Sequence, residues 1–244
     1  VGTANYAEAL SDPTMWATLG HTIMFTVMST VPLVLIALVM ALLVYVGIPG
    51  QWFWRLAFFA PYLLPVAVVV QIWTWLFNSD VGFVNYWLER MGLDKVGWLT
   101  DVDVAMWSMV ILTVWWTVGF NFLLYLSSLQ AIPDLLYEAA EVDGAGFWRK
   151  LWSITLPQLR GTTVLVVTLQ VIASLKIFDQ MFIAFSGGSG PEGSTRPILQ
   201  YIYDTGFTNY RMGYASAMSY IFFIVIIVIT VAFQFLTRSR KEAK

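Results

Sequence analysis

Five long apolar runs limit what this chain can fold into. These runs, each with almost no charged side chain, cover residues 20–46, 54–77, 104–127, 159–184 and 213–237. A helix needs about 20 apolar residues to cross the roughly 30 Å hydrocarbon core of a bilayer, so each run is long enough for one span. Because lipid offers no hydrogen-bond partners, each span must pair its own backbone groups, as a helix does. The sequence therefore predicts an all-α, polytopic membrane helix bundle with five spans, as one transmembrane domain over residues 1–244.

The composition agrees with a membrane protein and excludes several kinds of site. Hydrophobic residues make up 59% of the chain and charged residues 11%, whereas soluble domains are about a quarter charged. Cysteine is absent and His21 is the single histidine, which excludes thiolate metal sites and a histidine cluster within this chain. A membrane enzyme would need a nucleophile beside a base, and a channel or proton-coupled carrier would normally bury charges along several helices. This sequence offers no such nucleophile and base, and only the fourth run contains a lysine and an acid, so we expect no catalytic residue, no metal site and no cofactor in this chain.

Lysine and arginine predict the orientation. With a cytoplasmic C-terminus, the outer loops are residues 1–19, 78–103 and 185–212, and the inside segments carry twice as many cations as the outer loops. The inside cations are Arg55, Arg149, Lys150, Arg160, Arg238, Arg240, Lys241 and Lys244, and the outside ones are Arg90, Lys95, Arg196 and Arg211. Five spans then place the N-terminus outside. We therefore expect one further helix before Val1 and six spans in the native subunit.

The predicted inner face holds one long polar segment, residues 131–158. Pro133 can open a short helix, and Asp134 lies in its first turn, where the helix dipole favours an anion. Gly144 then breaks the helix, and the basic amphipathic stretch FWRKLW follows before Pro157. Two short helices joined by a glycine turn form a compact projection that suits docking to a partner.

The order of residues in this segment is specific. Glu138, Ala139 and Ala140 are followed after three residues by Gly144, and Ile154, Leu156 and Pro157 follow nine residues later. This pattern resembles the EAA loop of ABC-type importer permeases. The resemblance implies that Glu138 pairs with a basic residue of a separate ATPase subunit. It also implies that the two alanines pack closely against that subunit and that Gly144 makes the turn. The implied ATPase-coupling residues are Glu138, Ala139, Ala140, Asp143, Gly144, Ile154, Leu156 and Pro157.

Other stretches, including ANYAEALSDPTMWATLGHT, SGGSGPEGST and GYASAMS, are similar to the maltose and glycerol-phosphate branch of that family. The resemblance implies half of an alternating-access path for a di- or oligosaccharide in the bacterial inner membrane. Its implied partners are a sister permease, two ABC ATPases and an extracytoplasmic solute-binding protein. ATP and Mg²⁺ would bind the ATPases, since this chain has no GxxxxGK[ST] loop. The alternatives are a permease for glycerol 3-phosphate or a polyol and, less favoured, a secondary carrier or channel.

Polar and aromatic side chains inside the apolar runs are candidates for the solute path, because polar groups are costly in a membrane. Several share a helix face at spacings of three and four residues, and rings beside hydroxyls and amides suit a sugar. The candidates are Tyr62, Thr113, Trp116, Thr117, Phe120, Asn121, Gln170, Ser174 and Ile177. Plain helix packing stays open as the alternative, since serine and threonine are common between membrane helices. The set contains no arginine cluster to hold a phosphate, which favours a neutral solute.

Two charged residues fall near the outer end of the fourth run. Lys176 and Asp179 are three residues apart, so on one helix they would form an intramembrane ion pair that reduces the cost of burying them. A gating or solute-binding role is the alternative.

Overall fold

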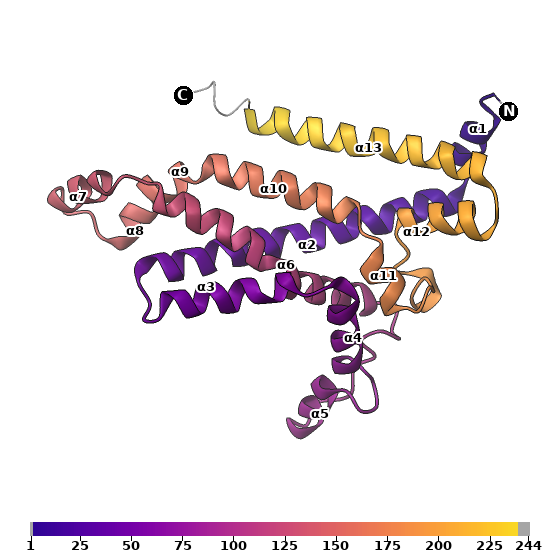
Figure 1. Cartoon of the computed structure of the whole chain (residues 1–244), viewed down its shortest axis with the longest axis horizontal. Helices are drawn as coiled ribbons and strands as arrows, with labels where there is room; N and C mark the ends of the chain where they lie inside the picture. Colours follow the sequence, from indigo (N-terminus) through magenta and orange to yellow (C-terminus); the bar gives the residue numbers. More distant parts are fainter. Residues whose placement is uncertain (1, 239–244) are drawn as a thin grey trace. The chain divides into compact units, whose positions relative to one another are not determined.

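The computed structural model describes residues 2–238, and every regular element in that part is helical, which confirms the all-α prediction. The first half contains α1 (Ala4–Ser11), α2 (Pro13–Val46), α3 (Gln51–Phe59), the 3₁₀ turn η1 (Ala60–Leu63), α4 (Val66–Leu76), α5 (Phe83–Arg90) and α6 (Ala105–Gln130). Next come α7 (Asp134–Val142), α8 (Phe147–Lys150), the π-helical η2 (Leu151–Thr155), α9 (Leu156–Gln158) and α10 (Arg160–Leu175). The last part contains α11 (Asp179–Ala184), η3 (Pro191–Gly193), α12 (Ile198–Tyr203), η4 (Asp204–Thr208) and α13 (Met212–Arg238) (Figure 1).

Three helices of the described chain are long and apolar enough to cross a membrane unbroken: Pro13–Val46, Ala105–Gln130 and Met212–Phe235. Two further pairs meet the same test only when joined, Gln51–Leu63 with Val66–Leu76 and Phe147–Gln158 with Arg160–Leu175, which allows up to five spans. Arg240, Lys241 and Lys244, used in the orientation prediction, lie outside the described residues.

Two of the apolar runs are not single helices. The run at 54–77 is interrupted before α4, because Pro65 has no amide hydrogen and disfavours helical geometry at the preceding residue. The run at 159–184 ends as a helix at Leu175, and α11 starts separately at Asp179. The helix that contains the first run is longer than the run itself, because α2 already starts at Pro13. The fixed φ of proline suits the first position of a helix.

The chain divides into two compact units. Of the described residues, the first unit contains 2–29, 64–113 and 171–238, and the second contains 30–63 and 114–170. Helices α2, α6 and α10 each contribute residues to both units.

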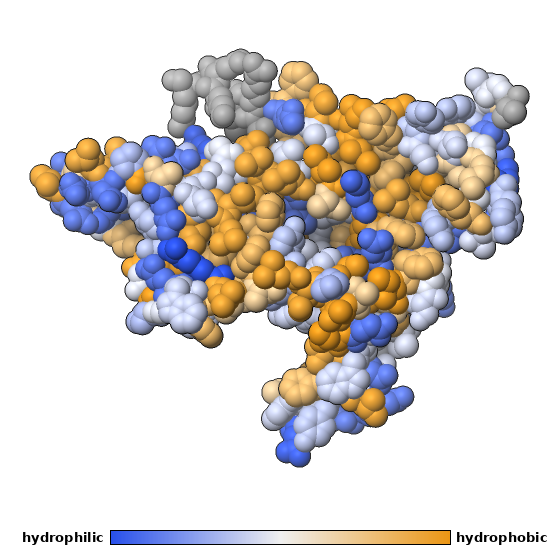
Figure 2. Space-filling model, viewed as in Figure 1, coloured by the Kyte–Doolittle hydropathy of each residue, from blue (hydrophilic) through white to orange (hydrophobic). Residues whose placement is uncertain are grey.

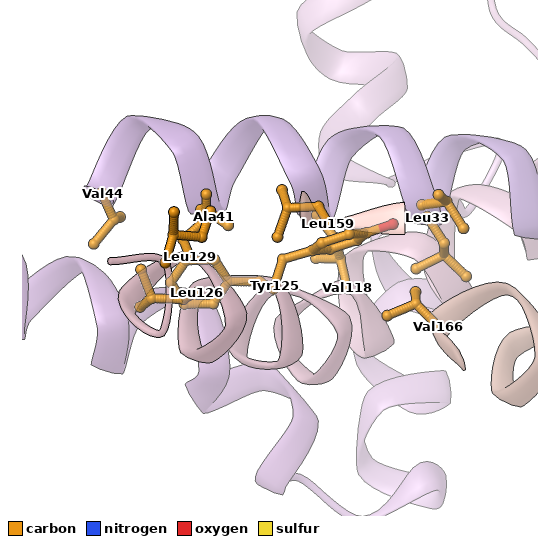
Figure 3. Close-up of a cluster of buried hydrophobic side chains, with 13 residues drawn as sticks. Leu33, Ala41, Val44, Val118, Tyr125, Leu126, Leu129, Leu159 and Val166 are labelled. Atoms are coloured by element: carbon orange, nitrogen blue, oxygen red, sulfur yellow. The ribbon is translucent and has the colours of Figure 1, made fainter. Parts of the chain in front are cut away.

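The core of the second unit forms between α2, α6 and α10 (Figure 3). Its labelled members are Leu33, Ala41, Val44, Val118, Tyr125, Leu126, Leu129, Leu159 and Val166. Helix α3 packs closely against this core: Phe58 meets Phe122 edge to face at 5.4 Å. At Gly119 of α6, an added Cβ would lie 2.8 Å from the Cα of Phe59 and closer still to the Phe58 carbonyl oxygen. The missing side chain therefore allows the backbones of α3 and α6 to touch.

The core of the first unit joins α1 and the start of α2 to α12 and α13 (Figure 1). Its buried residues are Ala9, Met15, Leu19, Leu175, Ile198, Tyr214, Met218 and Phe222. A polar network adds to this packing. Both carboxylate oxygens of Glu8 accept hydrogen bonds from Arg211, at 2.7 and 2.8 Å, and Asp12 accepts one at 2.6 Å from each of the Tyr201 and Tyr214 hydroxyls.

This network changes the electrostatics of Asp12. Partial burial acts to raise the pKa of the carboxyl group, but the hydrogen bonds from Tyr201, Tyr214 and the Thr14 amide outweigh it, so the pKa lies below its ordinary value. The charged form of Asp12 therefore stabilises the junction between α1, α12 and α13.

Candidate functional site

Helix α7 is bounded by residues that suit their positions. Pro133 precedes it in extended geometry, and Asp134 occupies its first turn. At the other end Gly144 has φ +73°, a left-handed conformation that favours glycine. The Gly144 amide donates to the Glu141 carbonyl at 2.9 Å and the Ala145 amide to the Ala140 carbonyl at 2.8 Å, which completes a Schellman motif. Helix α7 therefore ends in a sharp turn that is specified by the neighbouring residues themselves.

One face of α7 is turned outward. Leu135, Glu138, Ala139 and Val142 follow the i, i+3, i+4, i+7 spacing of a single helix face and are all exposed. Leu135 is 74% exposed and Val142 is 89% exposed, although both are apolar. Figure 2 shows hydrophobic residues among hydrophilic ones at the α7 end. This face has the mixed apolar and acidic character of a docking surface.

The opposite side of α7 packs against the segment that follows it. Glu141 pairs with Lys150 at 2.6 Å, and the hydroxyls of Tyr137 and Thr155 are hydrogen-bonded at 2.9 Å. Within the described residues, no ion pair involves Glu138. Of these two glutamates, Glu141 is therefore held within the chain, and Glu138 is available to a partner.

The other coupling candidates do not all share the outward face. Ala140 is partly buried, unlike Ala139, and Asp143 is exposed just after the end of α7. Ile154 packs against the core of the second unit. Leu156 and Pro157 are also partly buried. These last three residues support the segment from within the chain.

Beneath α7 lies a cavity of about 580 Å³. Its walls come from the end of α2, from α7 and from the stretch between Phe147 and Thr155, and include Tyr45, Tyr137 and the Glu141–Lys150 pair. Sequence reasoning missed this cavity and this ion pair. The signal for the pair was the presence of opposite charges on either side of the Gly144 turn.

Four of the solute-path candidates are brought together in the second unit. The Tyr62 ring stacks on Phe120 with centroids 5.3 Å apart, and both side chains are more than a third exposed. Beside Phe120 in sequence, Asn121 donates from Nδ2 to Oε1 of Gln170 at 3.1 Å, and both amides are buried. Trp116 and Thr117 of α6 are partly exposed. An aromatic pair with accessible rings and a buried amide pair are therefore joined through two consecutive residues of α6, Phe120 and Asn121.

The remaining path candidates, Thr113, Ser174 and Ile177, are buried in the first unit, and the two polar ones already bond to protein groups. Thr113 donates to the Met109 carbonyl at 2.7 Å and accepts a hydrogen bond from Gln180. The Ser174 hydroxyl lies 3.0 Å from that of Ser29, and Ile177 is buried. Helix packing accounts for these contacts, and sequence reasoning did not anticipate Gln180 or Ser29 as partners.

The predicted ion pair between Lys176 and Asp179 is not formed. Lys176 follows the last residue of α10 and Asp179 is the first residue of α11, so the two do not share a helix. Both are exposed, and neither belongs to any of the ion pairs among the described residues. The helix break removes the i, i+3 geometry on which the prediction depended.

Metal chemistry has no support in the described part of the chain, where no three His, Cys, Asp or Glu side chains gather closely enough to hold an ion. What the geometry provides is a projecting helix with an outward acidic face, on a bundle of apolar helices. These features define a polytopic membrane protein with a helix exposed for docking.

Comparison with known proteins identifies the family. The family model described as "Binding-protein-dependent transport system inner membrane component" matches residues 16–242. The chain belongs to this family, the permease subunits of ABC importers, which confirms the predictions of importer class and of the inner membrane.

Two curated relatives and one solved structure illustrate the similarity. The chain is 34% identical to the sn-glycerol-3-phosphate transport system permease protein UgpA of Agrobacterium fabrum, covering 96% of this chain and 79% of that protein. It is 32% identical to the arabinooligosaccharides transport system permease protein AraP of Halalkalibacterium halodurans, with coverages of 99% and 77%. A bacterial ABC transporter that imports the acidic polysaccharide alginate contains a chain with a TM-score of 0.84 at 22% identity, covering 98% of this chain and 84% of that one.

Proposed function

We propose that this permease uses α7 to couple a separate ATPase to inward, alternating-access transport of a neutral di- or oligosaccharide. The outward face of α7 carries the proposal, because it places an available carboxylate, Glu138, between two exposed apolar side chains, Leu135 and Val142. A basic residue in a cleft of the ATPase would pair with Glu138, and the apolar side chains would become buried around that pair. Ala139 would allow close approach, and Gly144 would hold the turn.

The proposed assembly contains this chain as one permease domain with half of the path, a sister permease, two ATPases and an extracytoplasmic binding protein. ATP and Mg²⁺ bind the ATPases. Because α7 must meet them, the segment 131–158 and the C-terminus are cytoplasmic. The exposed Arg149 and Arg160 on the same side of the bilayer agree with the positive-inside tendency.

The coupling proposal is tested by co-purifying the ATPase with this permease and its sister. We expect Glu138→Arg to abolish recovery of the ATPase and Glu138→Gln to reduce it. Glu89→Arg serves as the matched control, since Glu89 is an exposed glutamate in a helix of the other unit. Recovery with Glu138→Arg equal to that of the wild-type chain, or no recovery with the wild-type chain, would contradict the proposal.

The sugar proposal is supported by the Tyr62–Phe120 pair and the neighbouring Asn121–Gln170 amides. Aromatic faces stack on the apolar face of a pyranose, and amides bond to its hydroxyls. Two relatives named above carry arabinooligosaccharide and glycerol phosphate in their descriptions, so both solute classes belong in the test. Uptake by the assembled transporter should favour an oligosaccharide over glycerol 3-phosphate. Preference for glycerol 3-phosphate over every sugar tested would refute this part and leave the coupling proposal intact.

A further inference from the structure

The segment 131–158 is called here the coupling segment, and its second half has an exposed surface of its own, separate from the docking face of α7. Between Trp148 and Thr155 the exposure changes in pairs of residues. Trp148, Arg149, Trp152 and Ser153 are exposed, and the two tryptophans reach 69% and 68%. The intervening residues turn toward the core or the cavity and are Lys150, Leu151, Ile154 and Thr155. The exposed surface is called here the tryptophan–arginine surface: Trp148, Arg149, Trp152 and Ser153.

Charge separates this surface from the face of α7. The free acidic groups Asp134, Glu138 and Asp143 all lie in or directly after α7. On the later part of the segment the exposed charges are Arg149 and Arg160, and none of the ion pairs of the described chain includes either one. A partner with a basic cleft therefore fits α7, whereas the tryptophan–arginine surface fits an anionic partner.

The bend of the chain also points to the membrane surface. The helical stretch Phe147–Gln158 meets Arg160–Leu175 at 59°. When Arg160–Leu175 crosses the bilayer steeply, this bend turns the preceding stretch away from the bilayer normal, an orientation that suits a helix lying among the headgroups. Tryptophan is enriched at this depth, and arginine there attracts anionic lipid.

We propose that the tryptophan–arginine surface binds anionic phospholipid headgroups of the cytoplasmic leaflet. Trp148 and Trp152 insert among the headgroups, and Arg149 pairs with a lipid phosphate or carboxylate. This contact would hold the base of the coupling segment at the membrane while α7 engages the ATPase. The surface binds lipid whichever solute the transporter carries.

The absence of cysteine from this chain allows a direct test. Ser153→Cys places one label on the surface and keeps both tryptophans and Arg149, and Val142→Cys places a control label on the exposed face of α7. Each variant is labelled with a fluorophore, paired with its sister permease and placed in vesicles of phosphatidylcholine with phosphatidylglycerol. Because Val142 lies on the proposed docking face, both labels are first measured before the ATPases are added, and the label at 153 is measured again afterwards. Quenching is measured with one lipid at a time carrying a headgroup-level quencher.

We expect the label at 153 to be quenched, and more strongly by the anionic lipid than by phosphatidylcholine at equal mole fraction. Arg149→Gln should reduce that preference about five-fold while quenching itself persists. Trp148→Ala with Trp152→Ala should lower quenching by both lipids, and the label at 142 should show little quenching throughout. An absence of lipid quenching at 153 would overturn the proposal. Loss of that quenching when the ATPases are added would also overturn it, and would assign the surface to a protein partner.

Discussion

Replacing Gly119 by alanine tests the closest backbone contact of the second unit. The new Cβ would lie 2.8 Å from the Cα of Phe59, whereas a Cβ in ordinary van der Waals contact lies 3.4–4 Å from its neighbour. The nearest atoms belong to the main chain of α3, so no side-chain rotation can relieve the overlap. Helix α3 must move by several tenths of an ångström or more, and overpacking of this kind costs about 1–3 kcal/mol.

The assay is thermal unfolding of the assembled transporter in detergent, followed by fluorescence. We expect Gly119→Ala to lower the melting temperature by several degrees. Gly161→Ala is the matched control, because it also lies within a helix of the second unit but an added Cβ there meets nothing within 4 Å. Its expected effect is neutral or a stabilisation of up to about 1 kcal/mol, from the better helix propensity of alanine.

A second variant separates main-chain from side-chain strain. Adding Phe58→Ala to Gly119→Ala should not restore stability, since the obstacle is the Phe58 carbonyl and the Phe59 Cα. The close approach of the α3 and α6 backbones would be refuted if Gly119→Ala has the same melting temperature as the wild-type protein, or if Phe58→Ala restores the melting temperature of Gly119→Ala.

Three further changes have defined outcomes. Gly144→Ala forces a side chain into a left-handed conformation at φ +73° and should cost about 1–3 kcal/mol locally, measured as faster hydrogen exchange of the Ala145 amide and weaker ATPase co-purification. The folded-state pKa of Asp12 is depressed, so the stability that its carboxylate contributes is complete above the unfolded-state pKa and is lost as the pH falls below about 4. Asp12→Asn should therefore reduce the fall in melting temperature at acidic pH. If that fall is unchanged in the variant, the network with Tyr201 is not supported. Asn121→Ala removes a buried hydrogen bond to Gln170 and should lower the free energy of unfolding by about 1 kcal/mol or more. If Asn121 also lines the solute path, uptake by this variant must be slower than uptake by another variant with the same loss of stability.

The class of this protein was readable from local sequence patterns. Uncharged runs of more than 20 residues can persist as membrane helices without help from distant residues, because each helix pairs its own backbone groups. The turn after α7 is equally local: Gly144 supplies the left-handed geometry, and the bonds that close the motif span only three and five residues. The family resemblance used these same short-range features, and it correctly predicted an ABC importer permease.

Tertiary structure decided the rest, because it depends on residues far apart in the chain. Glu138 and Glu141 look alike in sequence, yet only packing against the later segment gives Glu141 its partner Lys150 and leaves Glu138 outward. The same is true of Gly119, whose small size matters only because α3 returns against α6. Lys176 and Asp179 failed as a pair because α10 stops at Leu175, a boundary that apolar periodicity does not mark. Hydrophobic patterning thus determined which segments are apolar enough for membrane helices, and helix packing determined where those helices break and which side chains stay exposed.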